Sequence, residues 1–194
     1  MRTHLPRFAI CLFVLTGCQV APEKVTFPEP NYAHLGQIQL AVDVVEVVEA
    51  YRPTFEAPNV EHLLPVAPMA AARAWALDRL AAAGGDRNRA VFTIHDASVV
   101  ETKLETGSGV RGVFTVDQSE RYDAQLSVEL NILGPGGGSR GSVTVTVKRA
   151  RSVAENITLS ERDQVWYGLT EALIDDMNRE LESGITAYLK SYLR

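Results

Sequence analysis

A glycine-rich segment near the middle of the chain has the letters of a dinucleotide-binding motif. Gly107, Gly109 and Gly112 follow the G-x-G-x-x-G spacing, in which glycines let the backbone approach a pyrophosphate held at a helix N-terminus. That chemistry needs a strand before the glycines and a helix after them. Here the next residues, 113–116 (Val-Phe-Thr-Val), are typical of a strand. We therefore interpret the segment as an inter-strand loop and expect no nucleotide cofactor.

A second segment, residues 137–141, has the G-x-S-x-G pattern of a hydrolase nucleophile. A nucleophile elbow is a sharp turn from a strand to a helix, whereas Ser139 lies in a glycine-rich turn between two expected strands. Three histidines outside the N-terminal signal are available as bases: His34, His62 and His95. His95 stands beside Asp96, but neighbouring strand residues point to opposite faces of a sheet. We expect no catalytic residues, and a hydrolase using Ser139 with His62 or His95 is kept as the alternative.

The chain shows no spacing of metal ligands. It has no H-E-x-x-H motif and no paired Cys or His residues at zinc-site spacing. Asp175 and Asp176 are adjacent on the polar side of an expected helix, where solvated carboxylates are the ordinary finding. We therefore expect neither a metal ion nor any other cofactor.

A short basic run, Lys148, Arg149 and Arg151, ends one of the expected strands. One interpretation is a solvated strand edge whose charges discourage pairing with other chains. The other is a contact for a phosphate-bearing lipid or for the acidic surface of a partner protein. We name these three residues as candidate binding residues.

Two aromatic residues, Trp166 and Tyr167, are adjacent on an expected helix beside the apolar residue Val165. Packing in the core is the usual role of such side chains. Because the two residues are consecutive, at least one of them is expected to leave the buried stripe. An exposed aromatic side chain would mark an interaction surface, so both are candidate binding residues.

The first seventeen residues have the organisation of a secretory signal. Arg2 and Arg7 give a positive start, and residues 8–15 form an apolar run. That run is shorter than the roughly 20 residues needed to span a bilayer. We expect residues 1–17 to be a cleaved signal peptide.

The residues that follow, Leu15-Thr16-Gly17-Cys18, resemble the bacterial lipobox. The resemblance implies that the thiol of Cys18 is diacylglycerated, that the signal is cut before it, and that the new amino terminus is acylated. Cys11 lies in the discarded signal, so Cys18 would be the only cysteine of the mature chain, and lipidation gives that thiol a role. By resemblance to sorting patterns, Gln19 favours the outer membrane, facing the periplasm, over the inner membrane.

The composition excludes some classes of protein. The 194 residues are 22% charged and 46% hydrophobic, as in an ordinary globular chain. Loss of Arg2 and Arg7 with the signal changes the formal charge from −5 to −7. We therefore expect no nucleic-acid partner, because such proteins carry a basic footprint. An acidic chain is also not held by electrostatic attraction to anionic headgroups, so the lipid must provide the anchor.

Residues 18–36 are interpreted as the lipidated cysteine and a tether, because Pro22, Pro28 and Pro30 interrupt a stretch without periodicity. A single domain is expected over residues 37–194. Alternation of apolar and polar residues predicts four strands. They cover about 38–44, 89–105 with a bulge near Asp96, 122–132 and 143–148.

Helical spacing predicts two helices. The first begins at Pro68 and is expected to end at Gly84-Gly85. The second begins at one of two overlapping capping boxes, Thr158 with Glu161 or Ser160 with Asp163, and continues to Leu189. Gly184 is a candidate position for a kink or break.

The order strand-helix-strand-strand-strand-helix predicts an α+β fold. Its economical form is a two-layer sandwich, with two helices on one face of a mainly antiparallel four-stranded sheet and polar residues on the other face. With the lipobox and tether, this element pattern over 37–194 resembles the lipoprotein that partners the lipopolysaccharide translocon, and the auxiliary lipoproteins of lipid-transport ABC systems.

The resemblance implies a non-enzymatic binding or assembly component of the cell envelope, accessory to lipid or lipopolysaccharide transport. It would reach the membrane through the lipid on Cys18 and bind an envelope protein or a lipid. The alternatives are a periplasmic hydrolase and a passive structural lipoprotein.

Overall fold

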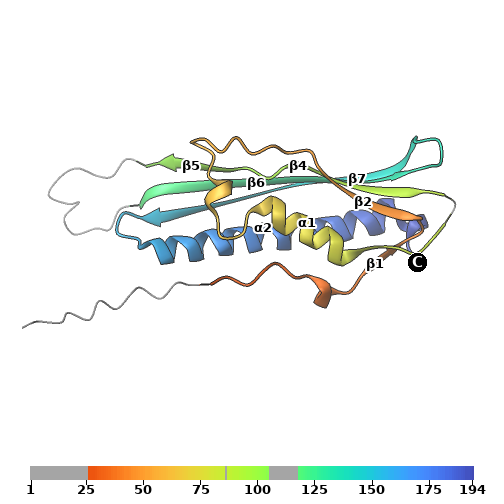
Figure 1. Cartoon of the computed structure of the whole chain (residues 1–194), viewed down its shortest axis with the longest axis horizontal. Helices are drawn as coiled ribbons and strands as arrows, with labels where there is room; N and C mark the ends of the chain where they lie inside the picture. Colours follow the sequence, from red (N-terminus) through yellow and green to blue (C-terminus); the bar gives the residue numbers. More distant parts are fainter. Residues whose placement is uncertain (1–25, 86, 105–117) are drawn as a thin grey trace, which may run out of the picture.

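A computed structural model describes residues 26–85, 87–104 and 118–194. Residues 1–25, which include Cys18, lie outside these ranges, as do residues 107–112 with the G-x-G-x-x-G pattern. The described chain is an elongated α+β sandwich, in which one sheet is covered on one face by two helices (Figure 1). The predicted fold class is confirmed.

The centre of the sheet is β6 (Gln118–Leu133), which forms an antiparallel hairpin with β7 (Ser139–Ala154). The other edge of β6 is shared by β4 (Arg89–Asp96) and β5 (Val99–Lys103), both antiparallel to it. Beyond β4 lies β2 (Val44–Glu49), which runs parallel to β4. The sheet therefore has five strands rather than four, because the segment predicted as one strand over 89–105 divides after the bulge near Asp96.

The two faces of the sheet differ in polarity, as the alternation predicted. Leu126, Val128 and Leu130 of β6 are fully buried, and their partners on β7 are Val147, Val145 and Val143. Side chains between them along β6 and β7 point to the opposite face, which we call the open face. Its members on these two strands include Ser127, Glu129, Asn131, Thr144 and Thr146.

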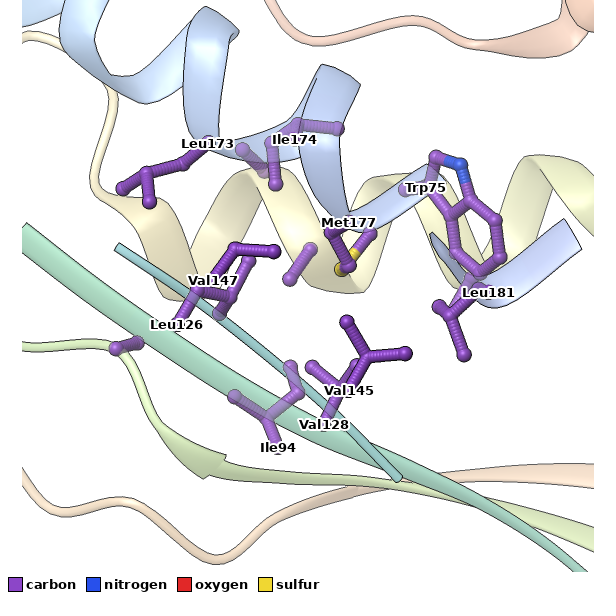
Figure 2. Packing of buried hydrophobic residues seen from close by; sticks show 14 of the residues in the cluster. Trp75, Ile94, Leu126, Val128, Val145, Val147, Leu173, Ile174, Met177 and Leu181 are labelled. Carbon is purple, nitrogen blue, oxygen red and sulfur yellow. The ribbon is translucent and has the colours of Figure 1, made fainter. Parts of the chain in front are cut away.

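Two helices, α1 (Pro68–Arg79) and α2 (Leu159–Tyr188), cover the apolar face (Figure 1). Figure 2 shows Met177 and Leu181 of α2 gathered with Trp75 of α1 over the side chains of Val128 and Val145. Each large apolar side chain buried in this way contributes about 1.5–3 kcal/mol. None of the helices in the described ranges is both long and apolar enough to cross a membrane.

The start of α2 is set by the first of the two predicted capping boxes. The Thr158 hydroxyl oxygen accepts a hydrogen bond from the Glu161 N–H at 3.2 Å, and the Glu161 carboxylate accepts one from the Thr158 N–H at 2.9 Å. These hydrogen bonds from Thr158 lower the pKa of Glu161. The helix then runs through Gly184 to Tyr188 without a break.

Two expected elements have different boundaries. The strand expected over 38–44 is divided into β1 (Ile38–Leu40) and β2, because Leu40, Ala41 and Val42 are all buried and cannot alternate between two faces. The first helix ends at Arg79 instead of at Gly84-Gly85, because the next residues form β3 (Leu80–Ala82) and pair in parallel with β1.

Residues 26–36, which we call the strap, lie along the outer side of the helical layer (Figure 1). The ring of Phe27 stacks on Tyr167 of α2, with 4.9 Å between ring centroids. Further along, the Tyr32 N–H donates to Asp78 Oδ2 at 2.7 Å. This part of the expected tether is therefore in contact with both helices.

Candidate functional site

The structure separates the basic run between the two faces of the sheet. Lys148 lies opposite Gln125 of β6 on the open face, whereas Arg149 and Arg151 lie opposite Ala124 and Tyr122 on the helix-facing side. Lys148 and Arg151 are exposed. The three residues therefore do not form one charged patch.

Arg149 is held by the helical layer. Its guanidinium donates to both carboxylate oxygens of Asp176 on α2, Nε to Oδ2 at 2.5 Å and Nη2 to Oδ1 at 2.8 Å. The Arg149 guanidinium, helped by Arg179, keeps the pKa of Asp176 below its usual range. A bidentate pair of this kind uses the donors that a ligand would need. Arg149 therefore joins β7 to α2, and the structure does not support its prediction as a free binding residue.

Lys148 borders a shallow recess of about 510 Å³ on the sheet. Gln125 is fixed beside it, because its side-chain amide donates to Asp96 Oδ2 at 2.6 Å. Among the described residues, Lys148 forms no ion pair. The recess is lined by Ser98, Val100, Arg121, Asp123, Ala124, Gln125, Lys148, Arg149 and Ala150.

Arg121 is a second cation at this recess that the sequence analysis did not single out. It lies on β6 and donates to Asp123, with Nη2 to Oδ1 at 2.8 Å. This hydrogen bond raises the pKa of Arg121 and lowers that of Asp123. The i, i+2 spacing of Arg121 and Asp123 on a strand was the signal that could have placed both on one face. Arg121 and Arg149 are each paired with a carboxylate, so Lys148 is the cation of this recess that has no ion pair within the described part of the chain.

Trp166 is not an exposed aromatic residue. Only 7% of its surface is accessible, and its ring meets Tyr122 edge to face at a centroid distance of 5.4 Å. The guanidinium of Arg162 lies 6.0 Å from the Trp166 ring centroid. Trp166 therefore does not present an exposed ring, because the buried stripe of α2 includes this position, and its role as a binding residue stays a prediction.

Tyr167 is the residue that leaves the stripe, and the strap partly covers it. It lines a hollow of about 470 Å³ between α2 and the strap, together with Tyr32, Glu171 and Asp175. Burial is the main reason that the pKa of Tyr32 is raised to about 12. The neighbouring Tyr167 and the carboxylates of Asp175, Glu171 and Asp78 raise it further. The aromatic pair formed by Phe27 and Tyr167 thus fastens the strap instead of forming an open surface.

Among the described residues, no hydrogen bond joins Ser139 to either histidine required by the hydrolase alternative. His95 is on the open face, with Nε2 3.3 Å from Glu129 Oε2. Ser139 begins β7 opposite Leu133, and its hydroxyl donates to Asn131 Oδ1 at 2.7 Å. The His95 ring and the Ser139 hydroxyl thus have different partners on β6, Glu129 and Asn131.

The other histidine of the domain, His62, lies near β5, because the neighbouring Asn59 bridges Val100, which is level with position 123 of β6, whereas Ser139 is level with position 133. His62 lies in a 3-10 turn, η2 (Glu61–Leu63), with its ring 5.4 Å from that of Phe55. The described residues contain no group of three or more His, Cys, Asp or Glu side chains arranged to hold a metal ion.

Comparison with known proteins finds only distant likeness to solved structures. No protein-family model matches the sequence, and no curated protein matches it. The fold is similar to that of rare lipoprotein B from Shewanella oneidensis, at 12% identity and a TM-score of 0.39, covering 75% of this chain and 96% of that chain.

Two further solved structures show the same degree of likeness. A minor lipoprotein from Acinetobacter baumannii has 18% identity and a TM-score of 0.38, covering 76% of this chain and 93% of its own. A protein of the DUF330 family from Xanthomonas campestris has 13% identity and a TM-score of 0.38, covering 78% and 87%. The structural neighbours are thus distant and nearly full-length, and two of them are named as lipoproteins.

Proposed function

We propose that the chain is a lipoprotein of the bacterial cell envelope that is anchored through Cys18 and acts as a non-enzymatic binding component. The observation that carries the proposal is the tetrapeptide Leu15-Thr16-Gly17-Cys18 after a charged and then apolar segment. Each methylene group of an acyl chain that enters the bilayer contributes about 0.8 kcal/mol, so several chains on one residue give a stable anchor.

The strap supports this proposal because it limits the distance between the domain and the membrane. Seven residues, 19–25, separate Cys18 from the first described residue, Thr26. An extended chain of this length reaches about 28 Å at most. Residues 26–36 lie on the helices instead of extending the spacer, so an acylated Cys18 would hold the domain close to the bilayer surface.

The residues that line the recess on the open face indicate the chemical class of the proposed ligand. Lys148 is exposed and has no ion pair with any residue that the structure describes, so it can meet a phosphate, and the fixed amide of Gln125 lies beside it. We therefore propose a phosphate-bearing lipid headgroup as the ligand, which fits a role accessory to lipid or lipopolysaccharide transport. Gln19 after the lipidated cysteine favours the periplasmic face of the outer membrane.

Purification of the intact lipidated protein from membranes in mild detergent tests this function. Mass spectrometry of the purified sample is expected to find phospholipid or lipopolysaccharide bound to the wild-type protein. Lys148→Glu should reduce the bound lipid, whereas Lys190→Glu, at an exposed lysine of η3 (Lys190–Tyr192), should not. Equal amounts of lipid in both variants would contradict the assignment of the recess.

A Cys18→Ala variant separates the anchor from the ligand site. It is expected to lose acylation and membrane association. Lipid that bound to Lys148 would still be recovered with the unanchored chain after it is incubated with the same detergent-solubilised membranes. A Cys18→Ala protein that stays in the membrane fraction would contradict the proposed anchor.

A further inference from the structure

The strand β7 has one edge without a partner strand. Over its sixteen residues it pairs with β6 alone among the strands of the described ranges. Unpaired N–H and C=O groups along such an edge can pair with another extended chain. The strand contains no proline, which would interrupt this pairing, and is regular from Ser142 to Val153.

A groove runs beside this edge, between β7 and α2. Its volume is about 360 Å³, and its β7 side is formed by Val143, Thr144 and Val145. Tyr188 stands at the helical side with 76% of its surface exposed. The groove is completed by Arg179, Glu180, Ser183 and Gly184 of α2.

Gly184 brings α2 close to the strand at this groove. A Cβ atom placed on Gly184 would lie 2.5 Å from Val143 Cγ1, which is closer than real contacts allow. The absence of a side chain at Gly184 therefore lets α2 lie against β7, and the groove beside the edge of β7 stays open. A strand added to β7 would continue the alternation of the sheet, so every second side chain would point into the groove.

Basic residues flank the unpaired edge of β7 and favour the binding of a segment with acidic ends. The centre, residues 142–147, alternates Val with Ser or Thr, while Arg140 precedes it and Lys148, Arg149 and Arg151 follow it. When two copies pair antiparallel about Thr144 or Val145, Arg140 of one copy lies opposite Lys148 of the other, or opposite Ala150 between Arg149 and Arg151. Like charges directly opposite each other destabilise a strand pair. The edge therefore fits another protein better than it fits a second copy.

We propose that β7 is a docking edge for an extended segment of a partner protein, with small apolar and hydroxyl side chains at its centre and acidic side chains at both ends. Main-chain hydrogen bonds would supply affinity, the Val143–Tyr188 groove would accept every second side chain, and Arg140 and Arg151 would pair with the acids. Docking at this edge of the sheet depends neither on lipidation nor on the lipid recess.

A synthetic peptide tests the docking edge directly. Its centre alternates valine and threonine, and its ends carry glutamate. The matched control peptide carries lysine at the ends. Detergent-solubilised full-length protein should bind the glutamate peptide more tightly than the lysine peptide, by roughly fivefold to tenfold in fluorescence anisotropy. Hydrogen exchange should become slower in β7 when the peptide is bound.

Variants at exposed positions keep the test independent of folding. Arg140→Glu combined with Arg151→Glu should reverse the preference between the two peptides. Tyr188→Ala should weaken binding, whereas Leu77→Ala, at an exposed apolar residue of α1 away from the groove, should not. Equal binding of both peptides, protection away from β7, or a dimer held through β7 would each overturn the proposal.

Discussion

Arg79, the last residue of α1, forms an ion pair with Glu182 of α2. Its guanidinium also donates to the carbonyl oxygens of Leu35 and Gly36 in the strap. The Arg79 side chain is 4% exposed, whereas that of Glu182 is 45% exposed. One buried cation therefore joins both helices to the segment through which an anchored chain would enter the domain.

Replacement of this cation should destabilise the domain. Arg79→Met is expected to lower the free energy of unfolding by about 2 kcal/mol, because it leaves the strap carbonyls without donors while Glu182 can turn to water. The matched control is Arg73→Met, which removes an exposed ion pair with Glu49 and should cost under ~0.5 kcal/mol. Denaturant unfolding of the two variants measures the difference, and equal losses would contradict the role of Arg79.

Two glycines of α2 should respond in opposite directions to the same substitution. Gly168→Ala meets nothing within 4 Å and should stabilise the protein by about 0.5–1 kcal/mol through helix propensity. Gly184→Ala should destabilise it, because the new methyl group overlaps Val143 and overpacking costs about 1–3 kcal/mol. Thermal unfolding of the two variants measures both changes in stability. Stabilisation by Gly184→Ala would show that β7 and α2 are not in close contact.

The pair of Arg149 and Asp176 should make stability depend on acid pH. Arg149 lowers the pKa of Asp176 in the folded protein, so the pair stabilises the fold above the unfolded pKa of Asp, about 3.9. The stabilisation is lost as the pH falls through the lower folded pKa. Asp176→Asn should flatten this part of the profile, whereas Asp175→Asn should not, since Asp175 has no ion pair among the described residues. Parallel curves of stability against pH for the wild type and Asp176→Asn would show that this pair does not cause the acid dependence.

The strap should loosen when its aromatic contact is removed. Phe27→Ala deletes the ring that stacks on Tyr167. The Tyr32 N–H, which donates to Asp78, should then exchange about fivefold faster, as expected for ~1 kcal/mol of lost contact. Phe55→Ala, at a ring that is 67% exposed on a loop, serves as the control. Unchanged exchange at Tyr32 would mean that the stacking does not hold the strap.

The main sheet could be predicted because its pattern is local. In β6, each residue from Tyr122 to Ile132 alternates between the core and the open face, so the sequence alone assigns its side. The capping box of Thr158 and Glu161 is also a contact between near neighbours in the chain. Such features need no knowledge of distant residues.

The rest depends on contacts between segments that are far apart in the sequence. The first helix keeps apolar spacing beyond Arg79, but pairing with β1 draws Leu80 into an extended conformation. The strap has no periodicity, and its position depends on Tyr167, which lies 140 residues after Phe27. Similarly, the pairing of Arg149 with Asp176 could be recognised only after α2 was placed against β7.

We infer that acyl groups on Cys18 anchor this domain to the envelope. Mass spectrometry of the N-terminal peptide of the mature protein, taken from the membrane fraction, tests it most directly. We expect a chain that begins at Cys18 and carries a diacylglyceryl group on its thiol and an acyl group, such as palmitate, on its amine. A mature chain that begins elsewhere, or a Cys18 with a free thiol, would contradict the proposed lipid anchor.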